Sequence, residues 1–353
     1  MQATAYEDRS STQTGTPAHA AWMAEVRLEV AADFTRYVER IASGAFDCPL
    51  PGAGRTAARF SALAAVAERD LSLVRLVEGH VDALAILAEL GAPAPGPAER
   101  WAVWAAEPRG EGLTASRSPE GWVLNGLKQY CSGAHSCTHA LVTATAEDGR
   151  RLFAVATGES EEGPGPRVGC RAVDGSWQAL GMAASDSASV VFTDVPALPV
   201  GAVGAYLERP GFQHGGIGVA ACWYGGARAV AELLADAAAQ RGPDPITDAH
   251  LGAVTMRLDA AASVLHQAAD EIDRDPTDTH GTARRRSLRV RAFVESVCSD
   301  VLAHVGRATG AEPLCHNPVH TRRATDLGVY LRQHHGDRNL AELGRLVAEA
   351  RLR

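Results

Sequence analysis

The sequence predicts an α+β protein in which a helical region, an antiparallel β-domain and a C-terminal helical bundle follow one another. Two changes in the hydrophobic pattern predict this order. Apolar residues first recur at helical spacing, then fall into short runs separated by turn residues, and finally return to helical spacing. We place a disordered tail at 1–20, an N-terminal helical domain at 21–100, the β-domain at 101–205 and the bundle at 206–353.

The first helical region carries an apolar stripe that includes a histidine. The stripe consists of Leu73, Val77, His80, Leu84 and Leu87, which share one face of a helix. The segment "GAPAPGPAER" then ends the helical pattern, because proline and glycine interrupt regular structure. On such a stripe His80 is either an ordinary core histidine or a functional residue, and the pattern leaves both open.

The middle region reads as short strands. The apolar runs are "WAVWAAE", "GWVLNG", "HALVTATA", "RLFAVAT" and "SASVVFTDV", with turn residues between them. The stretch "GWVLNGLKQYCSGA" (121–134) begins as an alternating strand and then places Tyr130 and Ser132 on either side of Cys131. Residues two apart share one face of a strand, so we expect both side chains to face the same way.

The C-terminal region predicts antiparallel helices with long seams. One seam consists of Leu251, Val254, Leu258, Ala261, Leu265, Ala268 and Ile272, and a second of Val290, Val294, Val297 and Val301. Spacings of three and four residues are typical of packed helices in a bundle.

Composition excludes several classes of protein. The net charge of −8 and the pI of about 5.9 give no basic footprint for a nucleic acid. No apolar run reaches the ~18 residues of a membrane span, and the first residues lack the pattern of a signal peptide. Glycine-rich nucleotide motifs and a GxSxG elbow are absent from the sequence.

The cysteines predict reduced thiols. The seven cysteines form an odd number with no CxxC pair, so we expect neither a disulfide framework nor a zinc site, and a cytoplasmic location. The short cluster Cys315, His316 and His320 lacks a fourth ligand at a recognisable spacing. We therefore expect no metal.

Four segments, in this order, resemble the acyl-CoA dehydrogenase superfamily. They are "VWAAEP", "GWVLNGLKQYCSGA", "LGMAASDSASVVFTDVPALP" and "AAQRGPDPITDAHLGAVTMRLDAA". The resemblance covers nearly the whole chain after the tail. It implies an N-terminal helical domain, a middle β-domain and a C-terminal four-helix bundle. It also implies FAD bound between the last two domains, and a homodimer or homotetramer.

The resemblance also implies contacts to the flavin. Tyr130 and Ser132 match an aromatic residue and a Ser/Thr that face the flavin ring, and Ala105, Ala106 and Glu107 match a segment whose backbone lines it. Arg241 matches an arginine that reaches the FAD pyrophosphate, often across a subunit boundary. The family's Gly-Ser-Asp loop is altered here to "RGEGL". Without the resemblance, the same residues would be a polar surface hairpin and an exposed arginine at a helix end.

The catalytic glutamate of the family is missing. Its usual place near the C-terminus reads "VYLRQHHGDRN", and its second known place reads "HGGIGVAACW", neither with a glutamate. Flavin-dependent monooxygenases of the same fold are similar in carrying histidines instead. His334 and His80 fit those positions, and His335 is adjacent. A histidine can act as a base near neutral pH, although a surface histidine pair would give the same pattern.

Three functions follow as expectations. The first is α,β-dehydrogenation of an acyl thioester, on CoA or a carrier protein, by an FAD enzyme with an electron-transfer partner. The second is a monooxygenase that takes FADH2 or reduced FMN from a flavin reductase and reacts it with O2. The third is a binding or other non-redox protein that retained only the fold.

Overall fold

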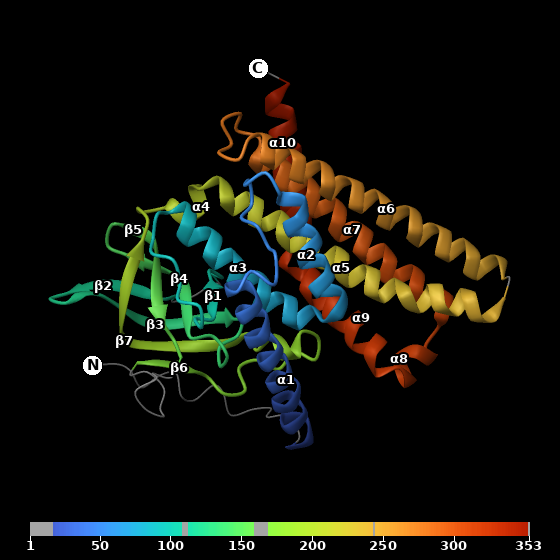
Figure 1. The fold of residues 1–353 in the computed structure, drawn as a ribbon, viewed down its shortest axis with the longest axis horizontal. Coiled ribbons are helices and arrows are strands. Elements are labelled where there is room, and N and C mark those ends of the chain that lie inside the picture. Colours follow the sequence, from blue (N-terminus) through green and yellow to red (C-terminus); the bar gives the residue numbers. More distant parts are fainter. Residues whose placement is uncertain (1–16, 108–111, 159–168, 243, 352–353) are drawn as a thin grey trace.

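In a computed structural model, helices precede and follow a group of β-strands along the chain. The strands lie at one side of the molecule, and the long C-terminal helices extend away from them (Figure 1). The structure describes residues 17–107, 112–158, 169–242 and 244–351. The N-terminal helices are α1 (Pro17–Ala42), α2 (Thr56–Arg69) and α3 (Leu71–Glu89). Most of the predicted tail therefore lies outside the described residues, whereas α1 already begins at Pro17.

Helix α3 is buried on nearly every side. Asp70 caps its N-terminus by accepting a 2.8 Å hydrogen bond from the backbone N–H of Leu73. The predicted apolar stripe is confirmed, since Leu73, Val77 and Leu87 are buried. The neighbouring face is buried as well, which makes α3 a central helix rather than a surface one.

The middle region forms one sheet of seven strands. They are β1 (Trp101–Trp104), β2 (Thr114–Ser118), β3 (Gly121–Cys131), β4 (His139–Ala146), β5 (Gly149–Ala156), β6 (Cys170–Ala172) and β7 (Ala188–Val200), with a short 3-10 helix η1 (Ala183–Ser185) before the last. Strands β4, β2, β3, β7 and β5 pair in turn, and β5 pairs with β4 again, so the sheet closes on itself.

The prediction of an antiparallel sheet was wrong for one part. Strand β1 pairs with β4 in parallel, and β2 touches β4 in parallel at a single position. Parallel neighbours need a long connection between them, and the β2–β3 hairpin lies on the chain between β1 and β4. The remaining pairs, β2–β3, β3–β7, β4–β5, β5–β7 and β6–β7, are antiparallel.

The C-terminal region is helical, as predicted. Its elements are α4 (Ala205–Glu208), α5 (Pro210–Arg241), α6 (Pro245–Arg274), α7 (Ala283–Thr309), α8 (Glu312–His316), α9 (Pro318–Tyr330), the 3-10 helix η2 (Leu331–Gln333) and α10 (Gly336–Ala350). The long helices α5, α6 and α7 pack against one another, and α9 packs on α5.

Both predicted seams are confirmed. Val290, Val294, Val297 and Val301 are buried on α7; on α6, Val254, Ala261, Leu265, Ala268 and Ile272 are buried, and Leu251 and Leu258 pack against the core. Helices α2 and α3 also pack directly on α5. Within the described ranges, no helix is long and apolar enough to cross a membrane.

Candidate functional site

The predicted ring-facing pair lies where β3 ends, but the two side chains do not share a face. Tyr130 is 58% exposed and Ser132 only 4%. Tyr130 has a left-handed backbone (φ 58°), and the pairing of β3 with β7 shifts between Lys128 and Cys131. This irregularity breaks the alternation of the strand, so the expectation of one shared face was wrong.

Left-handed backbones gather at this end of the sheet. Of the five described non-glycine residues with positive φ, Tyr130, Met182 and Asp186 lie here, whereas Asp194 and Asp278 lie elsewhere. Their segments are joined directly, because the N–H of Gly133 donates to the carbonyl of Ser185 (2.9 Å). Such conformations cost of order 1–3 kcal/mol each and occur preferentially at functional sites. The β3 end and the η1 loop therefore form the candidate site.

The residues at this end combine an exposed aromatic ring with polar groups that have no partner among the described residues. The exposed Tyr130 offers an aromatic surface for stacking. The hydroxyl of Ser132 has no hydrogen bond to any described residue, and its carbonyl accepts from the Trp104 indole N–H (2.9 Å). Ala105 and Ala106 follow β1, and within the described residues their backbone N–H groups have no backbone partner.

The side chain of Glu107 is bound by other side chains of the chain. Its carboxylate accepts hydrogen bonds from Lys128 Nζ (3.1 Å) and Thr143 Oγ1 (2.9 Å) and also pairs with Arg150. Burial raises the pKa of Glu107, but Lys128 and the other donors outweigh it and leave the pKa below its usual value. Any ligand contact at 105–107 therefore falls to the backbone. Residues 109–111 of "RGEGL" lie outside the described residues.

Arg241 lies far from the sheet within one chain. It is the exposed last residue of α5, at the end of the bundle that points away from the β-strands (Figure 1). The structure thus does not bring Arg241 and the β3 end together within one chain.

A buried charged seam, which the sequence did not reveal, runs between α3 and its neighbours. Its ion pairs are Arg59–Asp82 (2.6 Å), Arg75–Glu78 and Arg209–Glu89 (2.6 Å). Burial, with the Asp82 carboxylate adding to it and Arg75 opposing it, raises the pKa of Glu78 to about 8. The only signal was three charges at helical spacing on α3, which reads as a solvated face.

The candidate histidines His80, on α3, and His334, between η2 and α10, have different surroundings. His80 faces α1 and β1, where its Nδ1 accepts from the backbone N–H of Trp101 (3.2 Å) and its ring meets Phe34. Burial lowers the pKa of His80 to about 4, and no charged group contributes. His80 is therefore a satisfied core histidine in this structure, neutral at physiological pH.

His334 occupies a different environment. It is buried beside Trp223, with ring centroids 6.3 Å apart, and Asn339 lies 3.2 Å from its Nδ1. Burial, followed by the nearby Arg291, lowers the pKa of His334. Its imidazole is thus neutral near pH 7 and able to accept a proton. His335 is exposed and precedes α10.

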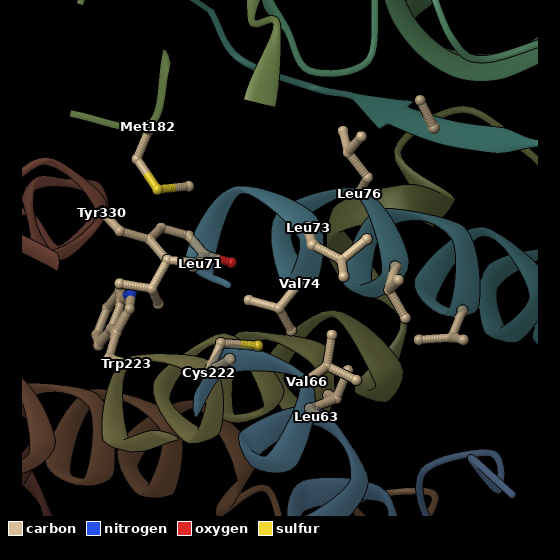
Figure 2. Close-up of a cluster of buried hydrophobic side chains, with 14 of the residues drawn as sticks. Leu63, Val66, Leu71, Leu73, Val74, Leu76, Met182, Cys222, Trp223 and Tyr330 are labelled. Carbon is tan, nitrogen blue, oxygen red and sulfur yellow. The ribbon is translucent and has the colours of Figure 1, made fainter. Parts of the chain in front are cut away.

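Tyr330 connects this region to the η1 loop. Figure 2 shows its ring between Met182 and Trp223, with the hydroxyl directed toward α3. The Tyr330 and Trp223 rings meet edge to face at 6.3 Å. The Trp223 indole N–H is buried without a hydrogen-bond partner among the described residues, and the buried Tyr330 hydroxyl has only the Cys222 thiol beside it. Unsatisfied buried donors are uncommon in proteins, and a water molecule or a polar ligand would satisfy this one.

A pH-dependent contact joins the η1 loop to α9. Asp326 is buried and accepts a hydrogen bond from the backbone N–H of Met182. Burial raises the pKa of Asp326 to about 7, although the Met182 N–H opposes the shift. A carboxyl whose folded pKa is raised stabilises the fold when protonated, and this stability is lost as the pH rises through the folded pKa.

We therefore expect Asp326→Asn to gain stability over the wild type as the pH rises from 5 to 8. The amide oxygen still accepts from Met182, and no charge is buried. The difference grows by at most about 1.4 kcal/mol per unit of pKa difference from an unfolded aspartate. Urea unfolding of both proteins at pH 5 and pH 8 measures this difference in the free energy of unfolding. A difference that does not change with pH would contradict the raised pKa of Asp326.

No metal cluster is present in the part of the chain that the structure describes. In "CHNPVH", Cys315 is exposed and His320 is buried, with its backbone N–H bonded to the Asn317 side chain.

The fold matches solved structures of flavin enzymes. One is TdsC from Paenibacillus sp. A11-2 with FMN and indole (18% identity, 93% of this chain and 97% of that chain, TM-score 0.73). Another is the methanesulfinate monooxygenase MsuC from Pseudomonas fluorescens (18%, 96% and 98%, 0.71). A third is a steroid ACAD, an acyl-CoA dehydrogenase (20%, 95% and 99%, 0.66).

The chain thus shares the fold of these solved structures, which include both a dehydrogenase and monooxygenases. No protein-family model and no curated protein matches the sequence.

Proposed function

We propose that the chain is a flavin-dependent monooxygenase that takes reduced flavin, FMN or FADH2, and O2. The observation that carries the proposal is the junction between α9 and α10. It contains His334, a buried neutral imidazole, and no glutamate between Leu331 and Asn339. Proton abstraction from an acyl thioester needs a carboxylate, and the segment HGGIGVAACW at the family's second place for it has no glutamate either. Oxygen transfer instead needs a group that moves protons near neutral pH.

The proposed flavin would contact described residues at the end of β3 and after β1. Tyr130 would stack on the ring, Ser132 would hydrogen-bond its edge, and the backbone of Ala105 and Ala106 would line it. Reduced flavin would supply the activation of O2. Arg241 of a second copy would bind the phosphate, for which its planar fork is suited, so we propose a homodimer or homotetramer. A His334→Gln variant that turns over an accepted substrate at the wild-type rate would remove the acid–base assignment.

The partners follow from this reaction. A separate flavin reductase would supply the reduced flavin, and the substrate would be a small molecule. The seven free thiols support a reducing, cytoplasmic location.

A second candidate is α,β-dehydrogenation of an acyl thioester, on CoA or a carrier protein, with bound FAD. The carboxyl that this candidate would use is Glu78, which is buried and pairs with Arg75, and whose pKa of about 8 would require deprotonation above neutral pH before it could act as a base. Dehydrogenation would also require an electron-transfer partner.

One pair of experiments separates the two. In the first, the protein is mixed anaerobically with oxidised FAD and butyryl-CoA or octanoyl-CoA, and the flavin absorbance is followed; the proposal expects no bleaching. In the second, the protein is mixed with photoreduced FMN and then with O2 in a stopped-flow instrument. The proposal expects reoxidation at a rate different from that of free reduced FMN. Bleaching by an acyl thioester would instead support the dehydrogenase.

A further inference from the structure

Arg291 reaches from α7 into the interior beside His334. Its Nη1 donates a hydrogen bond to the carbonyl of Gly216 on α5. Its guanidinium carbon lies 4.7 Å from the centre of the Trp223 ring, so the charge is stacked on an aromatic face. The side chain is partly accessible, which leaves it open to a ligand.

Arg291 differs from the other arginines of this interior. Arg59, Arg75 and Arg209 each pair with a carboxylate of the charged seam. Within the described residues Arg291 forms no ion pair, and its one hydrogen bond uses Nη1. Burial lowers the pKa of Arg291 to about 10, which leaves it charged at neutral pH. Glu78 is the one carboxyl that raises this pKa, and it pairs directly with Arg75 rather than with Arg291. A largely desolvated cation without an ion pair of its own is costly, and an anionic ligand would offset that cost.

One donor near Arg291 has an unmet hydrogen bond. The indole N–H of Trp223 is buried and has no partner among the described residues. The Tyr330 hydroxyl has only the Cys222 thiol beside it, and Tyr330 lies close enough to Arg291 to act on its pKa. His334 adjoins the same Trp223 ring. The surroundings thus combine a cation without an ion pair and one unsatisfied donor.

We propose that Arg291 binds the oxyanion of a small organic acid, which is the substrate of the flavin-dependent reaction. That this ligand is the substrate rests on the proposed function, whereas the oxyanion site itself is inferred from Arg291 and its neighbours alone. With Nη1 occupied by Gly216, the Nε–Nη2 edge remains for two parallel hydrogen bonds to a carboxylate or sulfonate.

The test compares one apolar ring with different head groups. Benzoate, benzenesulfonate and benzamide are titrated into the full chain by calorimetry near neutral pH, without flavin. We expect at least one anion to bind roughly tenfold more tightly than benzamide, since a charge-assisted pair is worth more than a neutral one. Benzoate and benzenesulfonate distinguish a planar from a tetrahedral oxyanion, and a preference for either supports the proposal.

Matched variants identify the residue. In Arg291→Gln the preference for the anion should vanish, whereas in Arg289→Gln it should persist, because Arg289 lies on the same helix and pairs with Glu271 at the surface. If Arg291→Gln does not fold, Arg291→Lys replaces it and should weaken anion binding at least several-fold. Wild-type binding that shows no preference for an anion, or a preference that survives at Arg291→Gln or is unweakened in Arg291→Lys, overturns the proposal.

The two proposals fail separately. These titrations contain no flavin, so a protein that binds benzoate through Arg291 but binds no flavin would refute only the proposed function. A protein that binds flavin but shows no preference for an anion would refute only the oxyanion site.

Discussion

Replacing Asp82 by alanine is expected to lower the free energy of unfolding by roughly 3–5 kcal/mol, the cost of breaking a buried ion pair. Arg59 is 1% exposed and donates to Asp82 at 2.6 Å; its other oxygen acceptor among the described residues is the carbonyl of Pro49. Without Asp82 the Arg59 charge remains buried and uncompensated. Urea unfolding followed by circular dichroism measures the loss.

The matched control is a surface pair. Glu349 pairs with Arg345 on α10, and both side chains are about half exposed. Exposed pairs contribute little to stability, so Glu349→Ala should leave the unfolding midpoint almost unchanged. Equal effects of Asp82→Ala and Glu349→Ala would show that the charged seam is not a buried network.

Gly225→Ala is expected to destabilise the contact between α2 and α5. A Cβ at this position would lie 2.2 Å from the carbonyl oxygen of Ala64, which is backbone and cannot rotate away. The two helices must move apart, and overpacking of a core costs typically 1–3 kcal/mol. Thermal unfolding of the variant should show a lower melting temperature than that of the wild type.

Gly252→Ala makes the same chemical change without the clash. Its Cβ would meet nothing within 4 Å, and the residue is exposed in the middle of α6. Alanine favours a helix over glycine by about 1 kcal/mol, so this variant should be more stable than the wild type. If both glycine variants changed the stability in the same direction, the close approach of α2 and α5 would be wrong.

The helical seams could be predicted because each depends only on local spacing. Val290, Val294, Val297 and Val301 repeat at helical intervals, and the structure buries all of them. The parallel pairing of β1 with β4 could not be predicted in this way. Strand pairing between distant segments depends on tertiary packing and leaves no periodic signal in either strand.

The burial of the charged face of α3 could not be predicted for a similar reason. Arg75, Glu78 and Asp82 look like a solvated helix face, and only α2 and α5 packing on α3 makes them a buried seam. Glycines on α5 permit this approach: a Cβ at Gly215 would lie 2.8 Å from Asp82 Oδ2.

The flavin contacts stay a prediction, and the structure bears only on the local geometry of the residues involved. The segment that contains Tyr130 and Ser132 lies beside other residues with left-handed backbones, which occur preferentially at functional sites. The prediction that both side chains share one face was wrong, because a bulge cannot be predicted from the alternation of residues alone. Arg291 and Tyr330 gave no signal, since each lies on an ordinary amphipathic helix and gains its role from neighbours distant in sequence.

The most direct test of the central claim is flavin binding at the β3 end. The purified chain is titrated with FMN and FAD, oxidised and then photoreduced, and the bound fraction is measured after gel filtration under the same conditions. We predict that at least the reduced flavin binds, that Tyr130→Ala and Ser132→Ala each weaken binding by several-fold, and that Leu198→Ala, an exposed position on β7, does not. Absence of binding in both redox states, or equal binding by the Tyr130 and Ser132 variants and the wild type, would contradict a flavin site at this end of the sheet.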